Sequence, residues 1–430
     1  MVKKIMDFQI IFYYKKTGKY ALNVVAGALD SHPHTKTVPI EFISSHNALI
    51  DAIKLASSQG LMPVVCWSFY SPDFKKISQE LQHIQQVTQH TYSVHLAGGV
   101  HATAEPMQTL QAGFNYVAVG EGEKIIIDFV NALRDENDLS KIQGIASLRH
   151  GKLHKNGKGD HIDLNHYAAG SVRYHKFGPI EITRGCIYAC KFCQTPFVNK
   201  ARFRHRSVES ICTAISNLKA HNSRDYRFIS PSSLSYGSSD ESVNFDAIED
   251  LLASIRSILG THGRLYFGTF PSEIRPEHIS KQILAILKRY VDNDNVIIGG
   301  QSGSNDILQS SHRGHNVDAV IRAVELSLQA GFLPHVDFLY GLPGETKKDA
   351  MASLKLSLKL SEMGAKIHNH TFMPLPGTPF RDQLPGNINQ EVQHQIVKLT
   401  SQGKAYGKWQ GQIKVAKQLA GMRNNRPERP

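Results

Sequence analysis

Residues 184–193 read RGCIYACKFC, and this stretch determines how the rest of the chain is interpreted. It holds Cys186, Cys190 and Cys193, three of the five cysteines in 430 residues. The other two, Cys66 and Cys212, lie far apart within apolar runs, and an odd number of cysteines cannot all pair. A disulfide scaffold is typical of much shorter, secreted chains. We therefore expect a cytoplasmic protein whose clustered cysteines bind metal or take part in catalysis.

Hydropathy and charge narrow the class of protein further. The N-terminal stretch MVKKIMDFQIIFYYKK has an apolar run too short for a secretory signal, and no run approaches the roughly 20 apolar residues that span a membrane. The formal net charge of +12 favours an anionic partner, such as nucleic acid, a phosphorylated small molecule or a membrane surface. A diffuse charge that only aids solubility is the equal alternative.

The spacing of the three cysteines, Cx3Cx2C, suits either of two metal centres. A structural zinc ion needs four ligands, so one more residue, such as His175 or His205, would have to join them. A [4Fe–4S] cluster can be held by three cysteines of one loop, which leaves one iron free to bind a small molecule. The loop follows the first strand of a predicted barrel, described below, and this position favours the cluster.

Strand-like and helix-like segments alternate through the first part of the chain. We expect strands at 8–14, 37–43, 62–69, 92–99 and 115–120, and helices at 19–29, at 46–58 and from about Glu123. The alternation predicts a flavodoxin-like, or Rossmann-like, doubly wound α/β sheet over residues 1–141. Residues 142–175 carry two short apolar runs around HGKLHKNGKG, which predict a hairpin and linker.

A second strand–helix series begins at Pro179. Its six expected strands are 179–185, 225–231, 264–270, 295–303, 334–341 and 366–374. Parallel strands joined by helical crossovers predict a partial (β/α)6 barrel of the TIM type over 176–380, with its chemistry at the C-terminal ends of the strands. Residues 381–430 are rich in lysine and arginine and predict a basic helical tail, frayed at its end, that adds no seventh strand.

The cysteine loop resembles that of the radical SAM enzymes, whose hallmark is a CxxxCxΦC loop after the first strand of a partial barrel. The resemblance covers residues 179 to about 380. It implies that Cys186, Cys190 and Cys193 hold a [4Fe–4S] cluster whose open iron chelates S-adenosylmethionine (SAM). One electron, from a donor such as flavodoxin or ferredoxin, would then release a 5′-deoxyadenosyl radical that abstracts hydrogen from an unactivated carbon.

The resemblance also gives SAM-binding roles to residues at the later strand ends. SPSSLSYGS (230–238) offers its serines to the methionine amine and carboxylate, although the Gly-Gly-Glu usual in the family is absent there. FPSEIRPE (270–277) offers groups to the ribose and the carboxylate, and FMPLPGTPF (372–380) offers its backbone to the adenine. The expected SAM-binding residues are Phe192, Ser232, Ser233, Ser272, Glu273, Arg275, Gln301, Ser302 and Met373.

The segment HLAGGVHATAEPMQTLQAGFNYVAVGEGE (95–123) resembles the cobalamin-binding domain that precedes the barrel in one radical SAM branch. The resemblance places Ser68, Gly98 and Gly99 beside the cobalamin. DSHPHT (30–35) begins like the Asp-x-His-x-x-Gly loop that supplies a lower ligand, but it lacks the glycine and follows the first helix. The cobalamin would therefore be base-off, without a histidine ligand. A plain Rossmann-like domain that uses the glycines in a tight turn is the alternative.

Bound cobalamin would imply methyl transfer to an unactivated carbon of an unidentified substrate, and the net positive charge favours an anionic one. One alternative is a radical SAM enzyme without cobalamin, such as a methylthiotransferase-like RNA modifier. Those enzymes carry a second cysteine triplet in their N-terminal domain, where this chain has only Cys66. The other alternative is a non-enzymatic iron–sulfur protein that binds nucleic acid. His368 and His370 alternate along the last barrel strand, and we expect one of them to point into the barrel and contact the substrate.

Overall fold

The computed structural model describes residues 7–385 and 388–423. The chain divides into two compact units, Met1–Gly178 and Pro179–Pro430, which are treated separately below. The segment 142–175 lies within the first unit by this division. Residues 424–430, which include the expected frayed end of the tail, lie outside the described residues. Within the described ranges, no helix is both long enough and apolar enough to cross a bilayer.

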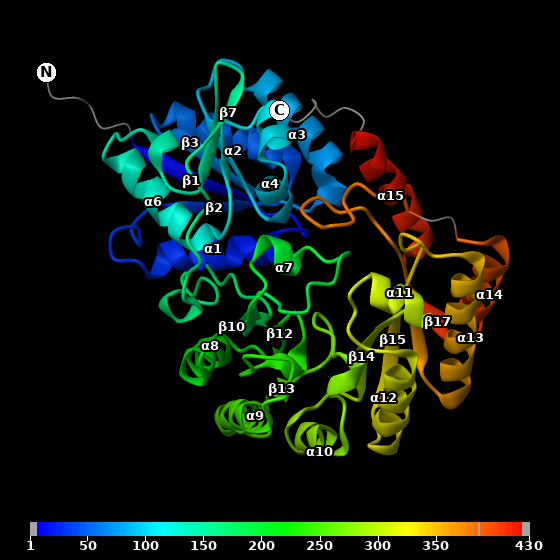
Figure 1. Ribbon diagram of the computed structural model, residues 1–430. Helices are drawn as coiled ribbons and strands as arrows, with labels where there is room; N and C mark the ends of the chain where they lie inside the picture. The colour runs from blue at the N-terminus through cyan, green and yellow to red at the C-terminus, as the bar shows by residue number, and fades with distance from the viewer. Residues whose placement is uncertain (1–6, 386–387, 424–430) are drawn as a thin grey trace, which may run out of the picture. The chain divides into compact units, whose positions relative to one another are not determined.

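The first unit is built around a sheet with the strand order β2-β1-β3-β4-β5-β6-β7. The first five strands run parallel, in the 2-1-3-4-5 order of flavodoxin-like folds, which confirms the predicted fold class. Figure 1 shows α1 and α6 on one side of this sheet and α2 and α3 on the other. The elements are β1 (Phe8–Tyr13), α1 (Lys19–Ser31), β2 (Ile40–Ile43), α2 (His46–Ser58), β3 (Met62–Ser68), α3 (Phe74–Val87), β4 (Val94–Gly98), α4 (Val100–Ala104), α5 (Pro106–Gln111), β5 (Tyr116–Ala118), α6 (Gly122–Arg134), β6 (Ile145–Arg149) and β7 (Lys152–Lys155).

Strands β1 and β3 are continuous buried apolar runs, as expected where helices cover both faces of a parallel sheet. The predicted hairpin within 142–175 is confirmed, because β6 and β7 pair antiparallel and β6 also pairs antiparallel with β5. Helix α2 begins where it was expected because the Ser45 side chain accepts a hydrogen bond from the Ala48 N–H and caps the first turn.

The second unit is a partial barrel of parallel strands with helices outside, as Figure 1 shows. The elements are β8 (Ile180–Glu181), β9 (Thr183–Arg184), α7 (Thr195–Val198), β10 (Arg204–His205), α8 (Val208–Ala220), β11 (Asp225–Tyr226), β12 (Phe228–Ile229), α9 (Phe245–Leu259), β13 (Arg264–Leu265), α10 (Lys281–Tyr290), β14 (Asn295–Gln301), α11 (Asn305–Ser310), α12 (Val317–Gln329), β15 (Leu333–Tyr340), α13 (Lys347–Met363), β16 (Lys366–Thr371), α14 (Gln390–Ser401), β17 (Ala405–Tyr406) and α15 (Trp409–Arg423).

The first half of the barrel is less regular than the second. The expected strand 225–231 is split, because β12 pairs with β8 on one side and β11 pairs with β13 on the other. A parallel bridge between Ile274 and Ile298 joins this half to the sheet β14-β15-β16-β17. Apart from the antiparallel pair of β9 and β10, the pairings are parallel, and the C-terminal ends of the barrel strands therefore meet at one end of the barrel. The cysteine loop follows β9 there.

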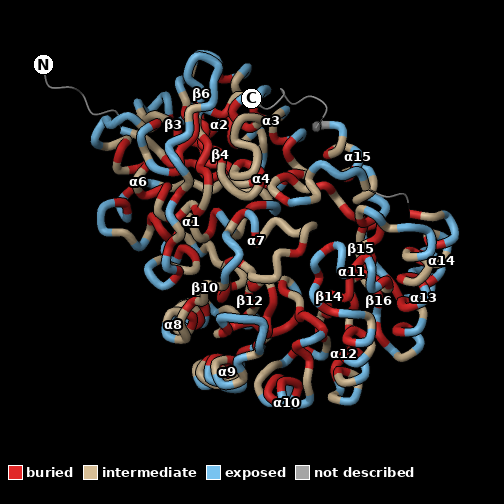
Figure 2. Tube along the Cα trace, viewed as in Figure 1, coloured by how far each residue is buried: buried red, intermediate tan, exposed pale blue. Residues whose placement is uncertain are grey.

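The tail prediction is wrong in one respect, because the tail does supply a further strand. Residues Ala405–Tyr406 form β17, which pairs in parallel with β16 through Ile367 and His368. The strand is only two residues long and lies between helices α14 and α15, so the sequence pattern around it is helical. Figure 2 shows the central strands, such as β3 and β4 of the first unit and β14 of the second, as mostly buried and the outer faces of the helices as exposed.

Candidate functional site

The cysteine loop is a tight turn that only glycine permits at its start. Gly185 has φ +81°, and a side-chain carbon there would lie 2.1 Å from the Arg202 carbonyl oxygen. The Cys193 N–H donates to the Cys190 carbonyl at 3.0 Å, which closes a turn between two of the three cysteines. This backbone presents Cys186, Cys190 and Cys193 from one short loop.

The three sulfur atoms do not all lie within 4.8 Å of one another. Tetrahedral zinc, with Zn–S bonds of about 2.3 Å, holds its sulfur atoms about 3.8 Å apart. Within the described part of the chain, one group of metal-ligating side chains has all its donor atoms within 4.8 Å of one another. That group does not include the three cysteines. His205 does not extend the set, since its ring nitrogens contact Thr183 Oγ1 at 3.0 Å and the Ser238 carbonyl at 2.8 Å. The arrangement fits a multi-iron cluster better than zinc.

Burial raises the pKa of the Cys186 thiol to about 12 and also raises the pKa of the Cys193 thiol. Both thiols are therefore protonated near neutral pH in the absence of metal. Thiolate is the metal-binding form, so cluster assembly must displace these protons.

Two buried arginines surround Cys190. Arg313 Nη1 lies 3.7 Å and Arg275 Nη1 lies 4.0 Å from its sulfur. Arg313 also pairs with Glu273 at 3.0 Å and donates to the Gly299 carbonyl at 2.8 Å. The two guanidinium groups therefore place positive charge directly beside the sulfur atom of Cys190.

Arg275, expected to bind the SAM carboxylate, is 2% exposed and is held on several sides. Its Nε donates to Glu277 Oε1 at 2.5 Å, and its Nη2 donates to the Arg313 carbonyl. The guanidinium carbon lies 3.5 Å from the centroid of the Tyr188 ring, which belongs to the cysteine loop. Arg275 thus connects the cysteine loop to the loop that follows β13.

The expected SAM-binding residues Ser232, Ser233 and Ser272 differ in their hydrogen bonding. Ser232 is 1% exposed, and its hydroxyl has no hydrogen-bonding partner in the protein. An unsatisfied buried hydroxyl is costly, and a ligand that bonds to it would remove the cost. Ser233 donates its N–H to the Glu273 carbonyl at 2.9 Å. The Ser272 hydroxyl already has two hydrogen-bonding partners within the protein. It donates to the Phe228 carbonyl and accepts from the Ser230 N–H, both at 2.9 Å.

The remaining expected residues lie at the ends of β14, β15 and β16. Phe192 packs against an apolar cluster, Ile307, Leu342 and Phe372, that comes from these strand ends. Gln301 has φ +68° at a register shift of β14 and directs its amide towards Glu273 Oε2 at 3.4 Å. Ser302 bonds Ser353 and the Ser304 N–H. Met373 is half-buried just after β16.

In the first unit, the three expected cobalamin-binding residues do lie together. Ser68 pairs with Gly98 across β3 and β4, and a side-chain carbon on Gly99 would lie 2.9 Å from Ser68 Oγ. The loop after β1 comes equally close, since a side-chain carbon on Gly18 would lie 2.0 Å from the Ser68 carbonyl oxygen. The carboxyl edge of these strands is thus lined by small residues that let the loops after β1, β3 and β4 pack closely on one another. Ligands of such sheets bind at this edge.

The match of the second unit to a family model settles its family. Residues 180–357, from β8 into α13, match the model of the radical SAM superfamily. The second unit contains a radical SAM domain. Cys186, Cys190 and Cys193 lie within the matched residues, and their role as cluster ligands stays a prediction.

Known proteins resemble the chain at low identity. A tRNA-2-methylthio-N(6)-dimethylallyladenosine synthase of Finegoldia magna is 26% identical over 219 residues, which make up 50% of this chain and 46% of that protein. The chain thus aligns with less than half the length of this relative.

Solved structures show the same fold over most of the chain. The radical SAM methyltransferase TsrM from Kitasatospora setae, with cobalamin and a [4Fe–4S] cluster bound, matches with a TM-score of 0.69 at 16% identity, over 88% of this chain and 78% of that chain. The cobalamin-dependent radical SAM enzyme OxsB, with aqua-cobalamin bound, matches with a TM-score of 0.63 at 14% identity, over 93% of this chain and 56% of that chain. At such identities the likeness shows the fold.

Sequence reasoning missed several residues of the radical SAM domain. Arg313 lies in SSHRGH (310–315), between α11 and α12, and no role was predicted for it. Glu277 and His315 form a further contact behind Arg275, at 3.4 Å. A basic residue in a short glycine-containing loop at the C-terminal end of a barrel strand is the signal that could have identified Arg313.

The prediction for the histidines is also wrong. Residues two apart on a strand point to the same side, so His368 and His370 share one face of β16 rather than opposite faces. Both lie beside Asp337 of β15, with His368 Nδ1 2.8 Å from Asp337 Oδ1.

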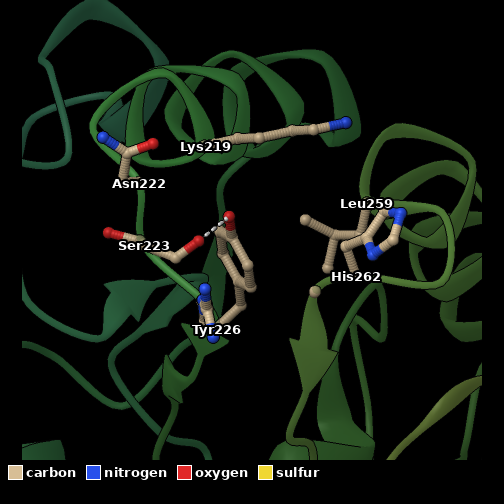
Figure 3. A pocket seen from close by; sticks show the side chains of 8 residues that line it. Lys219, Asn222, Ser223, Tyr226, Leu259 and His262 are labelled. Carbon is tan, nitrogen blue, oxygen red and sulfur yellow. Dashed lines mark hydrogen bonds between the residues drawn. The ribbon is translucent and has the colours of Figure 1, made fainter.

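A hollow of about 320 Å³ lies elsewhere on the radical SAM domain, at the amino ends of β11 and β13 (Figure 3). Lys219, Arg224 and His262 contribute to its lining, and the Tyr226 hydroxyl donates to the Ser223 carbonyl at 2.7 Å there. Catalytic residues of such barrels lie at the other ends of the strands, so this hollow has no part in the candidate site.

Proposed function

We propose that the chain is a cobalamin-dependent radical SAM methyltransferase that acts on an unactivated carbon. The observation that carries the proposal is the pairing of two units in one chain. A 2-1-3-4-5 sheet with a carboxyl edge of small residues immediately precedes the radical SAM domain. The fold shared with TsrM and OxsB, both solved with cobalamin, supports the same reading.

In this proposal Cys186, Cys190 and Cys193 hold a [4Fe–4S] cluster, and the nine expected SAM-binding residues surround the cosubstrate. When bound, the cluster supplies the electron that cleaves SAM, and methylcobalamin supplies the methyl group. The residues of the chain bind and orient SAM and exclude water from it. Arg313 holds positive charge beside Cys190, and the Ser232 hydroxyl donates to SAM. Phe192 seals one side with apolar contacts.

The proposed cobalamin site is the edge formed by Ser68, Gly98 and Gly99, and the cobalamin is base-off. His101 follows this edge, but its ring lies 4.3 Å from the Phe74 ring, and its Nδ1 lies 3.0 Å from Ser71 Oγ. These contacts and an exposed fraction of only 1% show that the His101 imidazole points into the interior of the first unit. No lower histidine ligand is assigned for this reason.

The second candidate is a methylthiotransferase acting on RNA, and the name of the Finegoldia magna relative favours it. The first unit weighs against it. Cys66 is 4% exposed and belongs to the apolar core, and burial raises the pKa of its thiol to about 12. Cys66 is also the sole cysteine in the sequence of the first unit, so a triplet of cysteines for a second cluster is missing there.

We further propose a cytoplasmic location, where thiols remain reduced, with flavodoxin or ferredoxin as the electron donor. The formal net charge of +12 would favour such an acidic donor and an anionic substrate.

The decisive experiment measures bound corrinoid. Anaerobically reconstituted protein is incubated with hydroxocobalamin and desalted, and corrinoid is quantified against iron. We expect close to one corrinoid for each four irons, and formation of 5′-deoxyadenosine when SAM and a reductant are added.

Two variants serve as controls. Replacing Cys190 with Ser should remove most of the iron and abolish SAM cleavage while corrinoid remains, whereas Cys212→Ser should change neither. Retention of the cluster without any corrinoid would contradict the proposal. In that case, methylthio-nucleosides in tRNA incubated with the protein would support the second candidate.

A further inference from the structure

A second group of metal-binding side chains lies on the strands β15 and β16. Asp337 lies directly opposite His368 in the register of these strands, and His370 follows two residues later. Within the described residues, Asp337, His368 and His370 form a group whose donor atoms all lie within 4.8 Å of one another. The group shares no residue with the cysteine loop or with the expected SAM contacts.

The three donor atoms form a triangle of the size that one metal ion requires. His368 Nδ1 lies 2.8 Å from Asp337 Oδ1 and 3.1 Å from His370 Nε2, and the third side, from His370 Nε2 to Asp337 Oδ1, measures 3.9 Å. A circle through the corners of this triangle has a radius of about 2.0 Å, which matches Zn–N and Zn–O bonds of about 2.0–2.2 Å.

Hydrogen bonds alone cannot satisfy all three of these donor atoms. His368 Nδ1 carries either one hydrogen or one lone pair, and it has two close polar neighbours. A hydrogen on Nδ1 satisfies Asp337 and faces His370. A lone pair accepts from His370 and faces the Asp337 carboxylate. A cation at the centre satisfies all three atoms at once, and His-x-His on a strand with a carboxylate from the next strand supplies ligands of the required type.

The group is partly accessible from the side of the strands that faces away from the helices. A side-chain carbon on Gly300 would lie 2.9 Å from Val336 and 3.3 Å from Val320 of α12, so Val336 lies on the helix side of the sheet, whereas the alternate residue Asp337 projects from the other face. The side chains of Asp337, His368 and His370 are 15%, 26% and 28% exposed. Glu273 and Arg313, which contact the cysteine loop, are near enough to act electrostatically on Asp337.

Residues of the tail hold the two imidazoles in place. The Tyr406 ring of β17 stacks on His368, with centroids 4.3 Å apart and planes at 8°. Gln412 of α15 accepts from the Thr371 N–H at 2.8 Å, and its amide nitrogen lies 3.2 Å from His370 Nδ1. Such outer contacts orient metal ligands and are needed for affinity.

We propose that Asp337, His368 and His370 bind one divalent transition-metal ion, Zn²⁺ or Fe²⁺. Two histidines and one carboxylate occupy one face of the ion and leave its other positions open. These positions would take an oxygen atom of the substrate, a step that rests on the proposed function of the radical SAM domain. The metal site itself stands on geometry alone.

The test measures metal in excess of the cluster. Cluster-reconstituted protein is treated with a chelator that leaves the cluster absorbance unchanged, then dialysed anaerobically against Zn²⁺ in one arm and Fe²⁺ in the other. We expect one further equivalent of metal per chain in the arm that contains the physiological ion. The affinity for the ion should fall at least about tenfold in His368→Ala, His370→Ala and the isosteric Asp337→Asn. Loss of a metal ligand should weaken binding more than loss of an outer contact does.

Two further variants sharpen the result. His394→Ala is the control, because His394 is an exposed histidine of α14 that belongs neither to the metal-binding group nor to its outer contacts. It should bind the ion as the wild type does. Gln412→Glu should bind it more tightly, because a carboxylate can accept from both the Thr371 N–H and a protonated His370 Nδ1.

Absence of the further equivalent in the wild type, or equal binding by the wild type and His368→Ala, would overturn the metal site. Neither result bears on corrinoid retention or on the cysteine loop. Conversely, protein that binds the further ion but retains no corrinoid would contradict the proposed methyl transfer and leave the metal site intact.

Discussion

Arg313 Nη1 lies 3.7 Å from Cys190 Sγ, while Nη2 of the same guanidinium lies 3.0 Å from Glu273 Oε1. One buried cation is thus shared between the cysteine loop and a carboxylate on the loop after β13. Removing one member of a buried ion pair leaves the other charge uncompensated, which destabilises a protein more than loss of a surface pair does.

We therefore expect Arg313→Gln to lower the free energy of unfolding by about 3 kcal/mol and to reduce the iron retained after reconstitution. The measurements are urea unfolding and iron content per chain. Arg289→Gln, which breaks an exposed pair with Glu249, should change both very little. Similar losses in the two variants would show that the contact with Cys190 has no special importance.

Gly185→Ala should disturb the cysteine loop. Both the positive φ and the carbonyl oxygen of Arg202, 2.1 Å from the added carbon, oppose a side chain there. Gly151 also has a positive φ, of +74°, but nothing lies within 4 Å of an added carbon. Gly151→Ala should cost about 1 kcal/mol of strain, whereas Gly185→Ala should cost more and lower cluster loading. Thermal unfolding and iron analysis distinguish the two, and normal loading in Gly185→Ala would refute the prediction.

Ser232 and Ser272 should respond in opposite ways to alanine. The Ser232 hydroxyl has no partner in the protein, so Ser232→Ala should leave stability unchanged or raised and weaken SAM binding. The Ser272 hydroxyl makes two buried hydrogen bonds, so Ser272→Ala should lower stability by about 1–3 kcal/mol. Calorimetric titration with SAM on cluster-loaded protein and thermal unfolding measure these effects. Unchanged SAM affinity in Ser232→Ala would rule out the assigned contact.

Glu345 should make stability depend on pH. Burial raises its pKa from 4.5 to about 7, although the Gly341 N–H donates to its carboxylate at 2.6 Å. The folded state keeps the proton that the unfolded state loses, so stability falls as the pH rises from about 4.5 to 7 and levels off above that. The fall attributable to this group is about 3 kcal/mol.

Glu345→Gln removes the titrating group and should flatten the profile of unfolding free energy over this pH range. The comparison is made on wild type and variant at matched ionic strength. Parallel profiles for the two proteins would mean that Glu345 titrates normally.

The sequence predicted those features that local pattern encodes. Continuous apolar strands gave the flavodoxin-like sheet, and three cysteines in eight positions gave the cluster-binding loop. Pairings that depend on distant residues were not accessible in the same way. β17 is two residues long and exists because Tyr406 packs on His368 from a chain segment 38 residues away. Arg313 likewise acquires its role only when the loop after β14 is folded against Cys190.

The histidine error has a different origin, since the period of a strand is a local property. His368 and His370 were read as alternating, although residues two apart lie on one face. Only the register of β15 against β16 brings Asp337 beside them, and one sequence does not reveal that register.

The pairing of β17 with β16 has a consequence for where the barrel can be cut. Without residues 381–430, β16 would become an outermost strand whose unpaired peptide groups invite association with other chains. The removal would also uncover Thr371, whose hydroxyl donates to the Trp409 carbonyl at 2.9 Å. A fragment ending near residue 380 should therefore be prone to aggregate, because β17 would no longer cover the edge of β16.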